Sequence, residues 1–177
     1  TTGPREHQDI LDHYIAVIEG KTGSLIAAAG EYGSLLSGAS EETVQIMARY
    51  GELVGVAFQL ADDVIDIVSD GASSGKTRGT DLREGVPTLP TILLDRAAAA
   101  GDESAREVRA LIDTDLSTDE ALGAAVSALA AHPVTEQAWR IAYEWADRAI
   151  AALAPLPEST AKAALTSFAH AVVHREG

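Results

Sequence analysis

The stretch Gly55-Val-Ala-Phe-Gln-Leu-Ala-Asp-Asp-Val-Ile-Asp-Ile-Val-Ser-Asp70 places carboxylates inside a segment that is otherwise almost wholly apolar. An unpaired carboxylate is costly to bury, so acids in such a helix need a partner. Asp62 and Asp66 are four residues apart, and on a helix they project from one face, one turn apart. This arrangement suits Mg²⁺, which takes oxygen ligands and often shares them with substrate phosphates.

Asp63 lies about 100° around the helix from Asp62, so it faces another side. The candidate metal ligands are therefore Asp62, Asp63 and Asp66. Asp63 is the weakest candidate for direct metal binding, because its position suits a side chain that supports a metal ligand. The alternative is that all three are solvated acids of an ordinary amphipathic helix, which the apolar neighbours on several faces disfavour.

Composition narrows the class of protein. The 177 residues are 46% hydrophobic and only 5% aromatic, which favours one helix-rich domain with a sizeable core. The formal net charge of −14 disfavours nucleic acids and anionic membranes as partners. The absence of cysteine excludes disulfides and thiolate metal sites. No apolar stretch approaches the roughly 20 residues of a membrane span, and no signal peptide opens the chain. We expect a soluble, cytoplasmic protein without an integral membrane segment.

Helical periodicity and start signals predict an all-α helical bundle, residues 1–177, in a single domain. No alternating strand pattern and no fixed-period repeat stand out. Helices are predicted at about 5–30, 41–69, 87–100, 103–113, 118–132, 135–153 and 157–175, with a loop at 71–85.

Lys21 and Thr22 interrupt an apolar helical pattern and are flanked by Gly20 and Gly23. The glycines predict either a kink or a point of close packing. An ammonium and a hydroxyl next to an accessible backbone suit a phosphate contact. The alternative is a surface lysine that buries its aliphatic stem.

The run Gly71-Ala-Ser-Ser-Gly-Lys-Thr77 has the composition of a nucleotide-binding P-loop but not its spacing. That motif needs four residues between its glycines, with a strand before it and a helix after it. Here there are three residues, and the segment follows a helix, so we reject this interpretation. Lys76 stays a candidate cation for a phosphate group, in the loop after the acidic helix. His170 and His174 have zinc-like spacing but lack a third ligand, so a polar helix face is the better interpretation.

Taken together, these segments resemble the trans-type polyprenyl diphosphate synthases, the family of farnesyl and geranylgeranyl diphosphate synthases. Ile18-Glu-Gly-Lys-Thr-Gly-Ser-Leu25 resembles the family's Lys-Thr helix, and the stretch from Gly55 to Asp66, with Phe58 and Gln59 before Asp-Asp-x-x-Asp, resembles its second aspartate-rich motif. Gly75-Lys76 through Gly79-Thr-Asp-Leu-Arg-Glu-Gly85, Thr88-Leu-Pro90 and the closing Val172-Val-His-Arg175 match further family segments.

The resemblance implies a partial isoprenoid-synthase fold. Family members are about twice as long, and their first aspartate-rich motif and isopentenyl diphosphate site lie upstream of the Lys-Thr helix. The chain thus resembles the C-terminal half of such an enzyme, inactive alone, whose partners are the missing N-terminal half and a second copy in a homodimer.

The implied reaction is prenyl transfer from an allylic diphosphate to isopentenyl diphosphate, with Mg²⁺ as cofactor. The resemblance assigns catalytic roles to Asp62, Lys21 and Lys76, and substrate binding to Lys21, Thr22, Phe58, Gln59 and Lys76. It assigns metal binding to the three aspartates named above. Two alternatives stay open: a terpene cyclase of the same fold, and a non-catalytic subunit or partner-binding fragment of such an enzyme.

Overall fold

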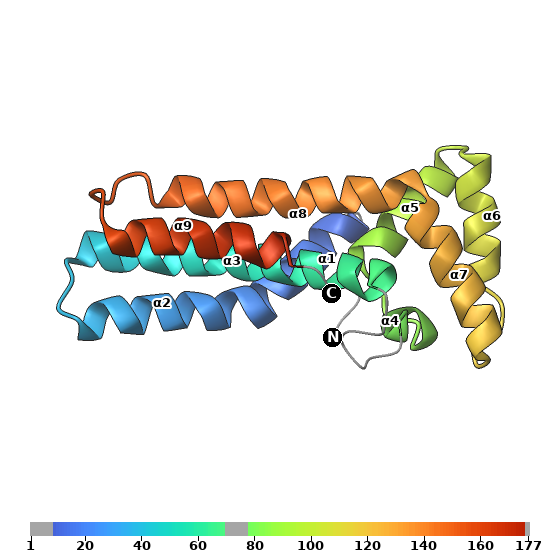
Figure 1. Ribbon diagram of the computed structural model, residues 1–177, viewed down its shortest axis with the longest axis horizontal. Coiled ribbons are helices and arrows are strands. Elements are labelled where there is room, and N and C mark those ends of the chain that lie inside the picture. Colours follow the sequence, from blue (N-terminus) through green and yellow to red (C-terminus); the bar gives the residue numbers. More distant parts are fainter. Residues whose placement is uncertain (1–8, 70–77, 176–177) are drawn as a thin grey trace. The chain divides into compact units, whose positions relative to one another are not determined.

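The computed structural model describes residues 9–69 and 78–175, and every regular element in these two ranges is helical (Figure 1). This confirms the predicted all-α class. The elements in chain order are α1 Ile10–Ile18, the π-helix η1 Glu19–Gly23, α2 Ser24–Leu36, α3 Glu41–Val68, α4 Thr80–Arg83, α5 Leu89–Ala99, α6 Glu103–Ile112, α7 Asp119–Ala131, α8 Pro133–Ala152 and α9 Thr160–Val173.

The described chain divides into two compact units. Unit 1 comprises residues 9–61 and 141–175, and unit 2 comprises residues 62–140. The helices α3 and α8 each contribute residues to both units. The expectation of a single domain stays a prediction.

In unit 1, small residues let α2 and α3 approach backbone to backbone. A Cβ added at Gly30 would lie 2.5 Å from the carbonyl oxygen of Met47, and one added at Gly51 would lie 2.5 Å from that of Ile26. Figure 1 shows α2, α3 and α9 running alongside one another. The Tyr50 hydroxyl donates a hydrogen bond of 2.7 Å to the carbonyl of Leu165, which ties α3 to α9.

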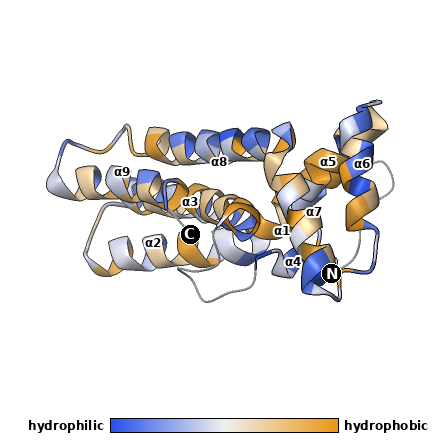
Figure 2. Cartoon of the chain, turned by 45° about the vertical axis from the view of Figure 1, so that its right-hand side comes forward, coloured by the Kyte–Doolittle hydropathy of each residue, from blue (hydrophilic) through white to orange (hydrophobic). Residues whose placement is uncertain are grey.

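In unit 2, α5 forms the apolar centre. Its first six residues, Leu89 to Leu94, are all buried, and Figure 2 colours most of this helix as hydrophobic. The helices α5 and α6 pack together, as do α6 and α7, and α4 contacts α7. Thr88 begins α5 with a capping box in which Thr91 is the reciprocal partner.

Three predicted boundaries are wrong. The helix expected to end near Gly30 continues to Leu36, because Gly30 serves close packing and does not end the helix. The segment expected to be loop through Gly85 contains the short helix α4. The last helix begins at Thr160 rather than Pro157, because the Ser159 side chain caps it by accepting the amide of Lys162. The predicted helix start near residue 5 lies outside the described residues.

Candidate functional site

The Lys-Thr segment lies on a π-helical turn. Residues Glu19–Gly23 form η1, between α1 and α2. A π-turn inserts an extra residue into a helix, and such turns are frequent at functional sites. The side chain of Lys21 is exposed, and that of Thr22 is half-buried. The predicted interruption is thus present, and it takes the form of a local change in helical winding.

Gly23 and Gly55 bring this turn against α3. A Cβ added at Gly55 would lie 2.9 Å from the Cα of Gly23 and 3.2 Å from the carbonyl oxygen of Thr22. Both glycines are buried. Any side chain at position 55 would therefore push η1 away from α3. The predicted close packing at Gly23 is confirmed. Gly23 packs against Gly55, the first residue of the stretch 55–70 that carries the aspartates.

Thr22 and Gln59 meet across this contact. The Thr22 hydroxyl donates to Oε1 of Gln59 at 3.2 Å. The two residues are 37 positions apart in the sequence, and both side chains are half-buried. Two of the residues that the family resemblance assigned to substrate binding are therefore brought together in unit 1.

The three aspartates of α3 have different surroundings. Asp63 is 5% exposed, and its Oδ2 accepts the amide of Leu89 at 2.8 Å. This hydrogen bond satisfies a donor in the first turn of α5, which a helix leaves without an intrahelical acceptor. Asp62 and Asp66 are both half-buried. The structure thus gives Asp63 a capping function at the start of α5, which the sequence analysis did not predict.

The end of α3 is held by the segment that follows residue 77. Arg78 donates from Nη2 to the carbonyl of Ile67 at 2.6 Å, and the Gly79 amide donates to the carbonyl of Asp66 at 2.9 Å. Gly79 adopts a φ of +71°, which favours glycine, and a Cβ there would lie 2.3 Å from Val126. The Asp81 amide lies 3.4 Å from Oδ2 of Asp66.

Within residues 9–69 and 78–175, no group of three or more acidic or histidine side chains is arranged to hold a metal ion. Asp62 and Asp66 supply two carboxylates from one helix face, and Asp63 is directed to the amide of Leu89. Lys76, the remaining predicted site residue, lies outside the described residues.

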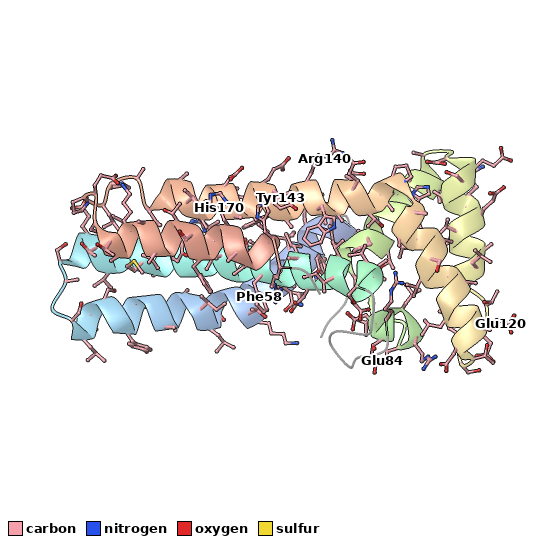
Figure 3. All side chains as sticks on the ribbon, viewed as in Figure 1. Phe58, Glu84, Glu120, Arg140, Tyr143 and His170 are labelled. Atoms are coloured by element: carbon pink, nitrogen blue, oxygen red, sulfur yellow. The ribbon has the colours of Figure 1, made fainter. Side chains whose placement is uncertain are left out.

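Sequence reasoning did not assign site-related contacts to Arg78 or Arg175. Arg175 donates from Nη2 to the carbonyl of Phe58 at 3.2 Å, and its guanidinium carbon lies 4.0 Å from the centroid of the Phe58 ring. Phe58 is labelled on α3 in Figure 3. The closing segment 172–175 resembles family members, and this was the available signal for Arg175. The resemblance did not indicate which residue Arg175 contacts.

His170 lies in the last turn of α9, and His174 follows the end of that helix. Nδ1 of His174 is 2.8 Å from the carbonyl of His170, and its ring centroid is 5.0 Å from that of Tyr143 on α8. Tyr143 and His170 are both labelled in Figure 3. These contacts agree with the interpretation of the pair as a polar helix face.

Comparison with known proteins identifies the family. The profile described as polyprenyl synthetase matches residues 3–129. The chain is 41% identical over 177 residues to nonaprenyl diphosphate synthase of Mycobacterium tuberculosis, covering all of this chain and 52% of that protein. It is 37% identical over 165 residues to octaprenyl diphosphate synthase of Escherichia coli, covering 93% of this chain and 50% of that protein. The chain belongs to the polyprenyl synthetase family.

Solved structures agree with this assignment. Geranylgeranyl pyrophosphate synthase from Corynebacterium glutamicum, complexed with calcium and isoprenyl diphosphate, matches with a TM-score of 0.84 and 37% identity over 97% of this chain and 52% of that one. Polyprenyl synthase from Caulobacter crescentus, also complexed with calcium and isoprenyl diphosphate, matches with a TM-score of 0.81 and 32% identity. The match covers 93% of this chain and 49% of that one. The chain thus spans about half the length of these relatives.

A membrane-spanning helix is not found among the described residues, since none of these helices combines the necessary length and apolar character.

Proposed function

We propose that this chain is part of a prenyltransferase that joins an allylic diphosphate to isopentenyl diphosphate and so makes a longer polyprenyl diphosphate. The observation that carries the proposal is the contact between Thr22 and Gln59. It ties the Lys-Thr turn to the residue pair Phe58-Gln59, which precedes the aspartates in the sequence. The family and the names of the relatives support the same reaction class.

Asp62 and Asp66 fit a partial Mg²⁺ site. Mg²⁺ is commonly held by one or two carboxylates together with water and substrate phosphate oxygens, so two aspartates one turn apart are a sufficient protein contribution. Both are half-buried, which leaves part of each side chain accessible. When bound, the metal would neutralise charge on the diphosphate leaving group. Asp63 holds this part of α3 against the start of α5, because its carboxylate accepts the amide of Leu89.

Lys21 and Thr22 supply the cation and hydroxyl for diphosphate oxygens in this proposal. The exposed ammonium of Lys21 is available to an anionic ligand, and charge-assisted hydrogen bonds to phosphate are stronger than neutral ones. The half-buried ring of Phe58 offers an apolar surface next to Gln59. Lys76 keeps its predicted role as a second cation for the diphosphate.

The relatives are about twice as long, so the proposed activity belongs to a complete fold of which this chain forms one part. The exposed apolar side chains of α2 support this view. Leu25 is 70% exposed and Leu36 is 86% exposed. They lie eleven residues apart and so share a helix face with Tyr32, which is 61% exposed. Such a stripe favours an additional helical partner.

The same observations support a second candidate, a non-catalytic subunit that binds a partner chain through α2. A terpene cyclase is less well supported, because the relatives described above are prenyl diphosphate synthases.

The deciding experiment is Mg²⁺-dependent condensation of isopentenyl diphosphate with an allylic diphosphate. It is run with the 177-residue chain alone and with a longer form that adds the segment corresponding to the other half of the relatives. We expect turnover in the longer form and none in the short chain. Asp62→Ala should abolish that turnover, whereas His174→Ala, which removes the ring contact with Tyr143, should change it little. Near-normal turnover in Asp62→Ala would contradict the proposed metal site.

A further inference from the structure

The side chain of Arg175 joins the end of α9 to the middle of α3. Its Nε donates to the carbonyl of Val172 at 3.0 Å, while Nη2 donates to the carbonyl of Phe58 at 3.2 Å. Its guanidinium carbon also lies 4.0 Å from the centroid of the Phe58 ring. One side chain therefore contacts its own helix end and both the backbone and the ring of a residue 117 positions away.

This combination of contacts is specific to arginine. The planar guanidinium can lie over an aromatic face and at the same time donate hydrogen bonds from its edge, whereas the ammonium of lysine is a point charge without such a plane. Arg175 is half-buried, so solvent competes less with these contacts than at an open surface. The contacts restrict both the ring and the main chain of Phe58.

Phe58 is directly followed by Gln59, whose Oε1 accepts the Thr22 hydroxyl at 3.2 Å. The pair Phe58-Gln59 is thus held by Arg175 at one residue and by the Lys-Thr turn at the next. We propose that Arg175 is a positioning residue for the prenyl diphosphate site, because it fixes the Phe58-Gln59 segment that receives Thr22 and thereby orients η1. This inference rests on the proposed function for its kinetic consequence, but its structural part can be tested without turnover.

The chain offers a matched control in the same unit. Arg148 lies over the ring of Trp145 with its guanidinium carbon 3.9 Å from the ring centroid. Both residues are on α8, so loss of this stacking removes a similar contact without touching Phe58, Gln59 or Thr22. The variants to compare are Arg175→Ala, Arg175→Lys and Arg148→Ala.

The first measurement is ¹⁹F NMR of the 177-residue chain labelled with fluorophenylalanine. The sequence contains two phenylalanines, Phe58 and Phe168, so Phe168→Leu assigns the spectrum. We expect Arg175→Ala to move the Phe58 resonance, Arg175→Lys to move it as well, and Arg148→Ala to leave it in place. An unchanged Phe58 resonance in Arg175→Ala overturns the proposal, whether or not the chain supports prenyl transfer.

The second measurement is a double-mutant cycle of Arg175→Ala with Thr22→Val, read by urea unfolding. If Arg175 acts on Thr22 through Gln59, the effects of the two substitutions on the free energy of unfolding are not additive. Additive effects overturn the proposal.

The third measurement uses the form of the protein that shows turnover. We expect Arg175→Ala to raise KM for the allylic diphosphate about fivefold, with kcat nearly unchanged. Loss of a cation–π contact such as that between Arg175 and Phe58 corresponds to about this change in affinity. Equal KM values in Arg175→Ala and the parent protein overturn the positioning role. Absence of turnover in every form, together with a displaced Phe58 resonance and non-additive unfolding, would instead contradict the proposed function and leave the coupling of Arg175 to Thr22 supported.

Discussion

Asp63 accepts the amide hydrogen of Leu89 at 2.8 Å, and this contact separates its role from those of the neighbouring acids on α3. The carboxylate is 5% exposed and lies at the start of a helix whose first six residues are buried. An acid in an apolar helix can therefore serve the fold, even when the spacing of its neighbours indicates a metal site.

Asp63→Ala should lower the free energy of unfolding by about 1–3 kcal/mol, because it leaves a buried amide without its acceptor. Asp63→Asn keeps an acceptor oxygen and should cost less. Urea denaturation checks both values. Asp62→Ala serves as the control, since the proposal assigns Asp62 to metal binding; a larger loss in Asp62→Ala than in Asp63→Ala would contradict this division of roles.

Gly55→Ala should destabilise the protein by about 1–3 kcal/mol, because the new methyl group would meet the backbone of η1 at Gly23. Gly20→Ala is the matched control on η1 itself, where an added Cβ meets nothing within 4 Å. Thermal unfolding followed by circular dichroism distinguishes the two. Equal melting temperatures would show that η1 and α3 can separate without cost.

Lys21→Ala in the form with turnover should raise KM for the allylic diphosphate by about tenfold or more, the loss expected for a charge-assisted hydrogen bond to phosphate. Steady-state kinetics at varied allylic substrate provide the measurement. Lys21→Arg retains the positive charge and should be less affected. Unchanged KM and kcat in Lys21→Ala would remove this residue from the site.

Tyr50 should make stability depend on pH at the alkaline end. Burial raises the pKa of its phenol from 10.0 to about 12. Between these values the unfolded chain loses the proton while the folded chain keeps it, so the free energy of unfolding falls as pH rises from 10 to 12. Tyr50→Phe removes this contribution and also the hydrogen bond to Leu165, at a cost of about 1 kcal/mol below pH 10. Urea denaturation at a series of pH values checks the slope, and identical slopes in the two proteins would contradict the prediction.

The exposed face of α2 should drive self-association of the isolated chain, consistent with the predicted homodimer. Sedimentation velocity over a range of concentrations should show a species larger than 18.4 kDa. Leu25→Glu combined with Leu36→Glu should shift it to the monomer, because both side chains are more than two-thirds exposed. Phe168→Glu changes an exposed aromatic residue on α9 and is the control. A monomer at every concentration would rule out contact through this face.

The sequence by itself determined the helical class, the approximate position of most helices, and the placement of Lys21, Thr22, Gln59, Asp62 and Asp66 as site candidates. Such signals are local, since helical periodicity, capping residues and i, i+4 spacing depend on neighbours within a few positions. The family resemblance added the expected reaction and the expected missing half.

Only the tertiary structure decided which of these residues meet. The close packing of Gly55 on Gly23, the use of Asp63 as a cap for α5, and the stacking of Arg175 on Phe58 each join residues at least 26 positions apart. Gly30 is a further example. Its local sequence indicates a helix end, but the residue lies inside α2, where the backbone of Met47 leaves no room for a Cβ. These contacts depend on how helices pack in three dimensions, and local sequence pattern does not encode that register.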